Sequence, residues 1–421
     1  MNFTTAILAR TLLVALSFWA LAPAQAQIPG TGEKIKSIVP IRAITSGKAH
    51  WFGYYDKEQF DSTDRYVLAA EVEFEDRSPN EDDVIILGMV DTQDGDKWIP
   101  LSESNAWGWQ QGCMLQWVPG SDSKIIYNTR EGDKHVAVVM DVFTREKKTL
   151  PRPIYTLSPD GKHALSVNFA RIQDTRPGYG YKGGVDPVAD QLAPEGDGIW
   201  SMDLETGESK LLFSYADIAA IPQEATPQGK HWFNHILYNT DGSRFIFLHR
   251  AHNVEGQGGK WTTRMFTAGA NGGDLNIVAD HGMVSHFVWR DPSHILAWSR
   301  EPGTGDAYYL YTDKSDKVEI VGEDVFTRDG HCTYSPDRKW MLTDTYPNKD
   351  NLHFVYLYNL EDKRFIELAQ IYRPKPGDNE WRCDLHPGWS HDGKTVAIDA
   401  MYLDGKRQIH LIDVSEYTMG K

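Results

Sequence analysis

The sequence predicts an all-β fold, a seven-bladed β-propeller that forms a single domain. Three observations carry this prediction. A turn motif occurs seven times along the chain, a second hairpin follows each copy, and no segment shows the sustained 3.6-residue apolar period of a long helix. The copies are spaced at about the length of one propeller blade. We therefore assign residues 27–421 to one propeller rather than to two or three separate domains.

Each copy of the motif joins an aromatic or apolar anchor residue to a polar turn, and a strand follows. The turn chemistry explains the motif, because Pro presets φ while Asp and Gly tolerate tight or left-handed positions. The hairpin after each copy, as at residues 199–213 and 355–368, completes a four-stranded blade. The seven anchors are Phe60, Trp117, Leu157, Tyr238, Trp289, Tyr334 and Trp389.

The longest gap between anchors, between the third and the fourth, contains an insertion at about residues 172–197 that is rich in Gly and Pro. A loop of this length inside a compact fold is either functional or mobile. It would contact a ligand such as a sugar chain or form a solvated decoration. Its side chains suited to ligand contact are Arg176, Tyr179, Tyr181 and Lys182.

The N-terminus has the layout of a secretory signal peptide. Arg10 precedes an apolar stretch at 11–21, and Ala24-Gln25-Ala26 forms an Ala-x-Ala cleavage site, so residues 1–26 are the expected signal. We expect export to the periplasm or the medium. No other apolar run is long enough to span a membrane.

The chain is acidic, with 43 Lys and Arg against 59 Asp and Glu and a net charge of −16. This charge excludes general binding to nucleic acid or to an anionic membrane, because long-range repulsion opposes both. An acidic ligand would need a local cationic pocket. We expect a monomer. The three cysteines are an odd number, so an exported chain leaves at least one thiol free, paired between chains, or bound to a metal.

Four histidines occupy the same position of the repeat, three residues before four consecutive anchors. Pseudo-symmetry places them at equal radii, so the four imidazoles are expected to converge on the central channel. Imidazoles with one thiolate suit Zn²⁺ best, with Mn²⁺ or Ca²⁺ as alternatives. A hydrogen-bonded histidine cluster is the alternative without a metal. The predicted ligands are His286, His331, Cys383 and His386, which leaves His235 for chemistry.

Several motifs together resemble those of exported seven-bladed propellers related to the oligogalacturonate lyases and the ulvan lyases. They are His50-Trp-Phe-Gly-Tyr-Tyr-Asp-Lys, the stretch 109–117, Asp329-Gly-His331 and the stretch 381–387. The resemblance covers essentially the whole mature chain. It implies a lyase that cleaves a uronic-acid-containing polysaccharide or oligosaccharide, ulvan-type or oligogalacturonate-type, by β-elimination.

The resemblance also implies a metal held by histidines of neighbouring blades, Mn²⁺-like in the oligogalacturonate lyases and structural in the ulvan lyases. The oligogalacturonate lyase motif Gln-x-x-His-x-His corresponds here to residues 383–388. Cys383 replaces the Gln, and Gly388 replaces the second His, a loss for which His331 is expected to compensate.

Tyr155 and Arg171 match the channel Tyr and Arg of the ulvan lyases. Gln110 and Gln111 stand where those enzymes have a catalytic His, and glutamine is no general base, so Tyr155 or His235 takes that role, or the activity differs. Arg171 would clamp the uronate carboxylate and lower the pKa of Tyr155. Further predicted substrate-binding residues are Arg250, Arg264, Tyr215, Gln111 and His50.

Other functions fit the sequence less well. A non-catalytic exported binding module similar to TolB would share the turns but would not need four equivalent histidines. A peptidase propeller would require a hydrolase domain, and no Gly-x-Ser-x-Gly elbow occurs in the sequence. A glycosidase would require a carboxylate pair, and none stands at matched positions of the repeat.

Overall fold

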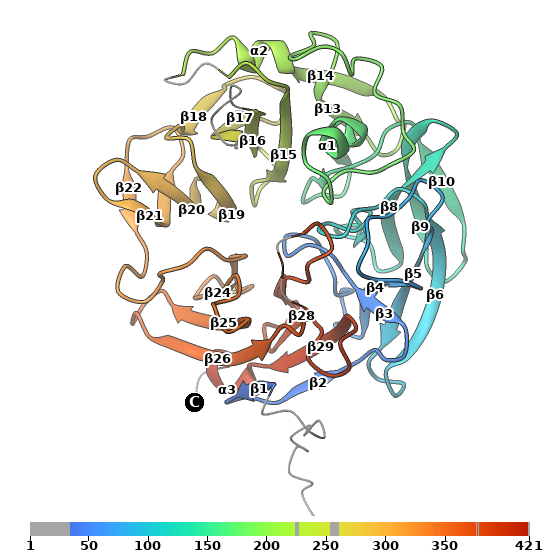
Figure 1. The fold of residues 1–421 in the computed structure, drawn as a ribbon, viewed down its shortest axis with the longest axis vertical. Coiled ribbons are helices and arrows are strands. Elements are labelled where there is room, and N and C mark those ends of the chain that lie inside the picture. Colours follow the sequence, from blue (N-terminus) through green and yellow to red (C-terminus); the bar gives the residue numbers. More distant parts are fainter. Residues whose placement is uncertain (1–33, 224–226, 253–260, 376, 378, 420–421) are drawn as a thin grey trace, which may run out of the picture.

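The computed structural model describes residues 34–223, 227–252, 261–375, 377 and 379–419. It contains seven antiparallel sheets arranged around a central axis, and the seven-bladed β-propeller predicted from the sequence is confirmed (Figure 1). The predicted signal peptide at 1–26 lies outside the described residues. In the described part of the chain, no helix combines the length and the apolar character needed to cross a bilayer.

The strands of each blade pair in chain order. Blade 1 contains β3 (Ala49–Trp51), β4 (Tyr66–Val72), β5 (Ile85–Asp91) and β6 (Lys97–Ser104). Blade 2 contains β7 (Gln116–Trp117), β8 (Lys124–Glu131), β9 (Lys134–Asp141) and β10 (Lys147–Leu150). Blade 3 contains β11 (Thr156–Leu157), β12 (His163–Ser166), β13 (Gly198–Asp203) and β14 (Ser209–Ser214). Blade 4 contains β15 (His231–Tyr238), β16 (Arg244–His252), β17 (Trp261–Gly269) and β18 (Asn276–Ala279). Blade 5 contains β19 (Val284–Asp291), β20 (His294–Glu301), β21 (Gly305–Thr312) and β22 (Val318–Ile320). Blade 6 contains β23 (Thr333–Tyr334), β24 (Trp340–Asp344), β25 (Leu352–Asn359), β26 (Phe365–Tyr372) and, as a fifth strand, β1 (Ile35–Ser37). Blade 7 contains β27 (Gly388–Trp389), β28 (Thr395–Ala400), β29 (Gln408–Asp413) and β2 (Ile41–Ala43). The helices are α1 (Phe169–Thr175), α2 (Tyr215–Ala219) and α3 (Ser415–Thr418).

The repeated turn joins the first and second strands of a blade. In blade 3 the Ser158 hydroxyl donates to the Asp160 carboxylate at 2.5 Å and accepts from the His163 amide at 3.0 Å. Gly161 follows at a φ of 67°, a left-handed conformation that glycine adopts without strain. The motif therefore encodes its turn through local hydrogen bonds, which explains why the sequence revealed the blades.

The N-terminal strands close the propeller. β2 pairs antiparallel with β29 as the outermost strand of blade 7, and β1 pairs with β26 as a fifth strand of blade 6. Residues from both ends of the chain thus share one sheet (Figure 1). Apolar side chains fill the space between blades, as where Phe60 of blade 1 and Trp117 of blade 2 share one core cluster. The ring of blades is therefore closed without covalent links.

The long connection of blade 3 is packed against the core. Its helix α1 begins after Asn168, whose side chain accepts from the Arg171 amide. The Tyr181 ring stacks on Phe169 with ring centroids 4.2 Å apart, and Asn128 donates to the Tyr181 hydroxyl at 3.1 Å. Both Tyr179 and Tyr181 are buried. The connection is therefore a built part of the propeller.

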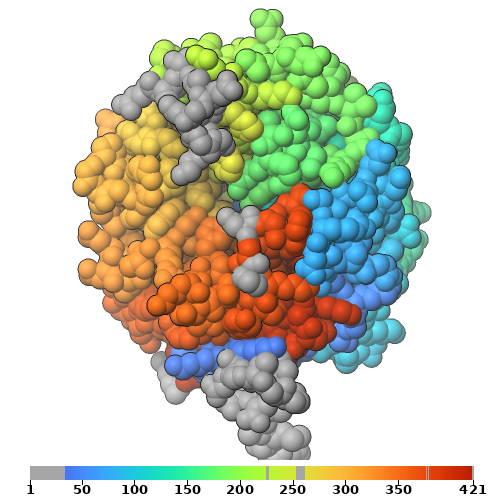
Figure 2. Space-filling model, in the orientation of Figure 1, coloured from blue at the N-terminus to red at the C-terminus, as the bar shows by residue number. Residues whose placement is uncertain are grey.

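One face of the propeller carries the features described next. Antiparallel strands alternate in direction, so the entry to the innermost strand and the link between the second and third strands lie at the same end of each blade. We call this end the entry face, and Figure 2 shows it. Near its centre the blue segment around residues 73–84, the green connection of blade 3 and the orange-red segment before β27 meet.

Candidate functional site

The four histidines predicted from the repeat lie together in the channel. Ring centroids are 5.9 Å apart for His235 and His286, 4.1 Å for His286 and His331, and 4.3 Å for His331 and His386. All four side chains are buried. His331 and His386 stand just before β23 and β27, whereas His235 and His286 lie within β15 and β19. The shared position in the repeat nevertheless brings the four together, as expected.

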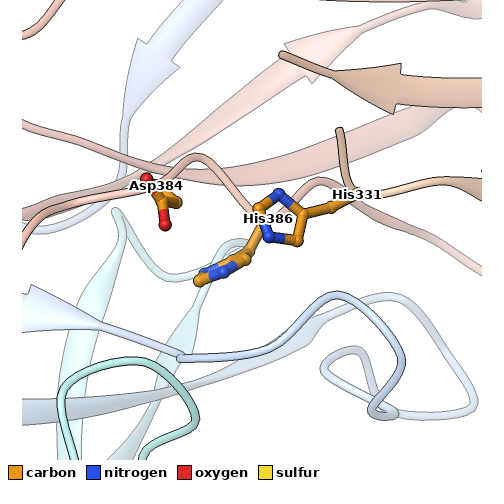
Figure 3. Close-up of side chains that lie close together, drawn as sticks. All are labelled: His331, Asp384 and His386. Atoms are coloured by element: carbon orange, nitrogen blue, oxygen red, sulfur yellow. The ribbon is translucent and has the colours of Figure 1, made fainter. Parts of the chain in front are cut away.

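Three buried residues could hold a metal ion. One ligand atom each of His331, Asp384 and His386 lie within 4.8 Å of one another (Figure 3). His331 Nδ1 lies 2.9 Å from Asp344 Oδ1, which leaves Nε2 for a cation, the usual arrangement of a metal-bound histidine. Asp384 Oδ1 is buried with no hydrogen-bond partner among the described residues. This donor set therefore fits a divalent cation.

The charges around Asp384 favour its ionised form. Burial acts to raise the pKa of its carboxyl, but the charges of Arg382, His386 and His331 outweigh burial and lower the pKa. His286 lies beside the three residues, and its Nδ1 is 3.0 Å from Asp329 Oδ1. His286 is therefore oriented in the same way as His331, with a carboxylate behind it.

The structure does not bring Cys383 into this group. Its Sγ lies 3.9 Å from the Asp384 carbonyl and 3.7 Å from the Asp399 carbonyl, and burial raises the pKa of its thiol to about 12. A signal for Asp384 was present in the sequence, because residues two apart share a side of an extended chain and Asp384 stands two residues before His386. Asp384 thus takes the place predicted for Cys383.

Two tyrosines from the segment after β3 lie against the histidines. The Tyr54 hydroxyl is 2.6 Å from His235 Nδ1, and its ring centroid is 5.2 Å from that of His386. The Tyr55 hydroxyl donates to the Phe287 carbonyl at 3.0 Å, and its ring contacts His331 at 5.3 Å. Both tyrosines are buried. They pack the channel next to the histidines.

The structure contradicts the roles predicted for Arg171 and Tyr155. The Arg171 guanidinium is fully buried and donates to the carbonyls of His231, Gln191 and Leu192, so it has no free edge for a substrate carboxylate. It therefore does not lower the pKa of Tyr155. Burial raises that pKa well above the usual tyrosine value.

Tyr155 instead holds the backbone of His235. Its hydroxyl accepts from the His235 amide at 2.7 Å and donates to Gln111 Oε1 at 3.0 Å. His235 has a φ of 50°, which is rare for a residue other than glycine, and this clamp stabilises it. Gln111 therefore acts through Tyr155, and Tyr155 is a positioning residue.

Three further predicted substrate-binding residues have structural partners. Arg264 donates to the Ile218 carbonyl at 2.8 Å and to the Ile221 carbonyl at 3.1 Å. Tyr215 is buried under the Arg171 guanidinium, with its ring stacked on Phe233. His50 Nε2 lies 3.3 Å from a Glu71 carboxylate oxygen within blade 1. None of the three touches the histidine cluster through any contact of the described residues.

Arg250 does reach the site. It is buried at 3% exposure, and its Nη1 has no hydrogen-bond partner in the described part of the chain. Its Nε and Nη2 make only long bonds, 3.3 Å to the Thr263 hydroxyl and 3.4 Å to the Val284 carbonyl. Burial, and then Arg176, lower the pKa of Arg250 to about 9. An unpaired buried guanidinium is costly, so this group is suited to an anionic ligand.

The sequence placed Tyr179 among the side chains of the insertion suited to ligand contact, and in the structure it is the most unusual titratable group of the site. Burial acts to raise the pKa of its hydroxyl, but the guanidinium charges of Arg176 and Arg382 outweigh burial and lower the pKa to about 8. Arg382 Nη2 donates to the Tyr179 hydroxyl at 3.1 Å, and the Arg176 guanidinium lies 4.2 Å from the centre of its ring. The Tyr179 hydroxyl therefore ionises more readily than that of an ordinary tyrosine.

These groups form one cationic centre. The Tyr179 ring is 6.0 Å from that of His235, and Trp261 links the two guanidiniums, with Arg176 at 4.6 Å and Arg250 at 5.8 Å from its ring centre. No acidic partner of Arg176 or Arg250 occurs among the residues that the structure describes. We call Arg176, Tyr179, Arg250 and Arg382 the cationic centre. It can bind an anion and supply a base beside it.

The comparisons with known proteins support the fold. No family model and no curated protein matches the chain. An oligogalacturonate lyase from Vibrio parahaemolyticus is similar in structure, with a TM-score of 0.62 at 16% identity over 90% of this chain and 96% of that one. A puromycin-hydrolyzing peptidase of Mycobacterium tuberculosis matches at a TM-score of 0.52 and 11% identity, over 85% of this chain and 52% of that one. A Pyrococcus horikoshii acylaminoacyl peptidase matches at 0.51 and 13%, over 86% and 51%. At such identities the likeness shows the propeller fold alone.

Proposed function

We propose that this protein is an exported polysaccharide lyase that cleaves a uronic-acid-containing glycan by β-elimination. One observation carries the proposal: an ionisable tyrosine lies between two guanidiniums and close to a third, buried guanidinium that has a free edge. The resemblance of the motifs to those of uronate lyases agrees with this chemistry. The acidic surface does not oppose it, because the positive charge is local.

The reaction needs three groups. The uronate carboxylate must be neutralised so that charge can develop at the carbon next to it, a base must remove the C5 proton, and the leaving O4 must be protonated. In the balanced step the C5–H and C4–O4 bonds break and a C4=C5 double bond forms. The proton passes from C5 through the enzyme to O4, so no further reactant is required.

The cationic centre supplies these groups. The free Nη1 of Arg250 binds the carboxylate, and Arg176 adds charge on the other side of Trp261. The Tyr179 phenolate takes the C5 proton, and the resulting phenol returns it to O4. Arg382 orients the Tyr179 hydroxyl through its 3.1 Å hydrogen bond. His235, held by Tyr54 and Tyr155, forms the wall beside Tyr179.

A divalent cation fits next to this centre. His331, His386 and Asp384 would hold it, with His286 adjacent, and Zn²⁺ or Mn²⁺ suits imidazole and carboxylate ligands. When bound, the ion would fix the innermost strands of blades 6 and 7 and add positive charge at the bottom of the site. Arg382 links the two regions, because its Nε donates to Asp384 at 2.8 Å.

The test is an assay for the unsaturated uronyl product. The mature protein is incubated with ulvan, oligogalacturonate and other uronans after metal is restored, and the absorbance of the product is recorded. Tyr179→Phe is expected to lose at least about 1,000-fold in kcat, whereas the matched Tyr66→Phe, at the far end of β4, keeps wild-type activity. No product from any uronan would refute the lyase proposal and leave the TolB-like binding module. Full activity of Tyr179→Phe would refute the assignment of the base.

A further inference from the structure

One tyrosine at the edge of the cationic centre has a hydroxyl group that the fold does not use. Tyr346 is half-buried, and its hydroxyl has no hydrogen-bond partner among the residues that the structure describes. The neighbouring tyrosines differ, because the hydroxyls of Tyr54, Tyr155 and Tyr179 are all hydrogen-bonded. A partly exposed phenol that is free to donate a hydrogen bond is suited to contact a ligand.

The backbone holds Tyr346 in place although its hydroxyl is free. Tyr346 lies in the link between β24 and β25, at the entry face, and its amide donates to the Asp329 carbonyl at 3.2 Å. Asn348 closes this link, because its amide donates to the Leu352 carbonyl at 2.9 Å and its side chain accepts from the Leu352 amide at 3.0 Å. The Tyr346 ring therefore has a defined position, which a group that acts on a reacting atom requires.

The ring of Tyr346 contacts both the cationic centre and the histidine cluster. Its centroid is 6.0 Å from that of His286 and 5.8 Å from that of His331. The Arg382 guanidinium lies 5.8 Å from the centre of the same ring, and it also donates to the Tyr179 hydroxyl at 3.1 Å. Arg382 therefore connects the two tyrosines.

The order of these groups follows the order of the reacting atoms. The contacts of Arg176 and Trp261 described above connect Tyr179 to Arg250 of blade 4. On its other side, Tyr179 is connected through a guanidinium to the Tyr346 ring of blade 6. In a uronate the carboxyl carbon is attached to C5, and C5 is attached to C4, which carries the leaving oxygen O4. A uronate with its carboxylate at Arg250 and its C5–H bond at Tyr179 would therefore direct O4 toward Tyr346.

We propose that Tyr346 is a further catalytic residue, which donates a hydrogen bond to the leaving oxygen O4. This inference rests on the proposed function for the positions of the carboxylate and the base. As the C4–O4 bond breaks, its electron pair moves to O4, and the Tyr346 hydroxyl stabilises the charge that develops there. The proton that Tyr179 takes from C5 then neutralises O4. Tyr346 keeps its own proton, so the step needs no further reactant.

The experiment compares two leaving groups in Tyr346→Phe, which removes only the hydroxyl. Both substrates are built on the uronate that the wild-type protein cleaves best, one with a sugar at O4 and one with 4-nitrophenoxide at C4. A sugar alkoxide needs stabilisation as it leaves, whereas nitrophenoxide is stable as an anion. The kcat of Tyr346→Phe is therefore expected to fall about 100-fold on the sugar substrate and less than about threefold on the nitrophenoxide substrate.

Two matched variants and two physical measurements separate this role from a structural one. Tyr356→Phe, on β25 of the same blade, removes the hydroxyl of another half-buried tyrosine and should keep the wild-type kcat on both substrates. Tyr179→Phe should lose activity on both, because each reaction requires the base. Since the Tyr346 hydroxyl has no partner in the described part of the chain, Tyr346→Phe should also keep the wild-type Tm and metal content.

The outcomes distinguish a failure of the inference from a failure of the proposed function. Equal losses of kcat on the two substrates, or a loss of metal that matches the loss of activity, would overturn the inference and leave the proposed function in place. Full activity of Tyr346→Phe on the sugar substrate would do the same. A wild-type protein that releases neither an unsaturated uronyl product nor nitrophenolate would refute the proposed function and the inference with it.

Discussion

The charge of Arg176 is expected to set the pH dependence of the proposed lyase reaction. Arg176 is the largest favourable influence on the ionisation of Tyr179, and it acts against burial. A base must be deprotonated, so activity should rise with pH up to about 8 and then level off. Arg176→Gln removes the charge but keeps a side chain of similar length. The rise should therefore move to higher pH.

The size of the effect follows from the pKa values. Tyr179 has a pKa of about 8, against an ordinary value of 10.0. At pH 7 a group with a pKa of 8 is about one-eleventh ionised, and a group with a pKa of 10 is about one-thousandth ionised. Because burial remains while the larger of the two guanidinium influences is lost, Arg176→Gln should lower kcat at pH 7 by about 10- to 100-fold. The loss should shrink as the pH approaches 10.

The assay is a pH profile of kcat on the best uronan, recorded from pH 5 to about 10. The ultraviolet absorbance of tyrosinate in the free protein gives a second readout that needs no turnover. Arg145→Gln, in the exposed turn between β9 and β10, is the matched control and should keep the wild-type profile. A profile of Arg176→Gln that is lowered equally at every pH would refute the reasoning, because it would show a loss of positioning rather than of ionisation.

Three further outcomes are expected. Arg250→Gln removes one charge-assisted hydrogen bond to the carboxylate, which is worth about 2 kcal/mol, so kcat/KM should fall about 30-fold, mainly through KM, in steady-state kinetics; an unchanged KM would contradict the carboxylate role. His386→Ala removes one of three ligand groups, so metal analysis of the purified protein should show loss of the ion and a lower Tm; an equal metal content would contradict the site. Tyr155→Phe leaves the buried His235 amide unsatisfied and should cost about 1–3 kcal/mol in thermal unfolding while the pKa of the pH profile stays the same; a shifted pKa would restore Tyr155 as the base.

The sequence predicted the features that repeat. The turn around Ser158 and Asp160 is encoded by hydrogen bonds between residues a few positions apart, so the motif reports its own conformation. The position of His286 and His331 follows from the same repeat, because each lies three residues before an anchor. The rule that side chains alternate would also have favoured Asp384 over Cys383 as the partner of His386.

The cationic centre could not be predicted in this way. Arg176 and Tyr179 come from the connection of blade 3, and Arg382 comes from the segment before β27, two stretches that carry no repeat. Their contact depends on the closure of the whole ring. Arg171 shows that a matching position in the sequence does not guarantee the same role. Its spacing matched that of a catalytic arginine, but in the structure its guanidinium is bound by backbone carbonyls. The repeat defines the blades, and long-range packing defines the chemistry.

Under the proposed function, the charge of the cationic centre would allow a chain of net charge −16 to bind an acidic sugar. Exposed carboxylates more than about 8 Å away are largely screened at physiological salt, whereas buried groups are not. Burial and Arg176 already lower the pKa of Arg250 to about 9, so its protonated form is held at a cost in the free protein. A uronate carboxylate at Arg250 Nη1 would compensate both the burial of the guanidinium and its repulsion by Arg176, and would therefore stabilise the protonated form.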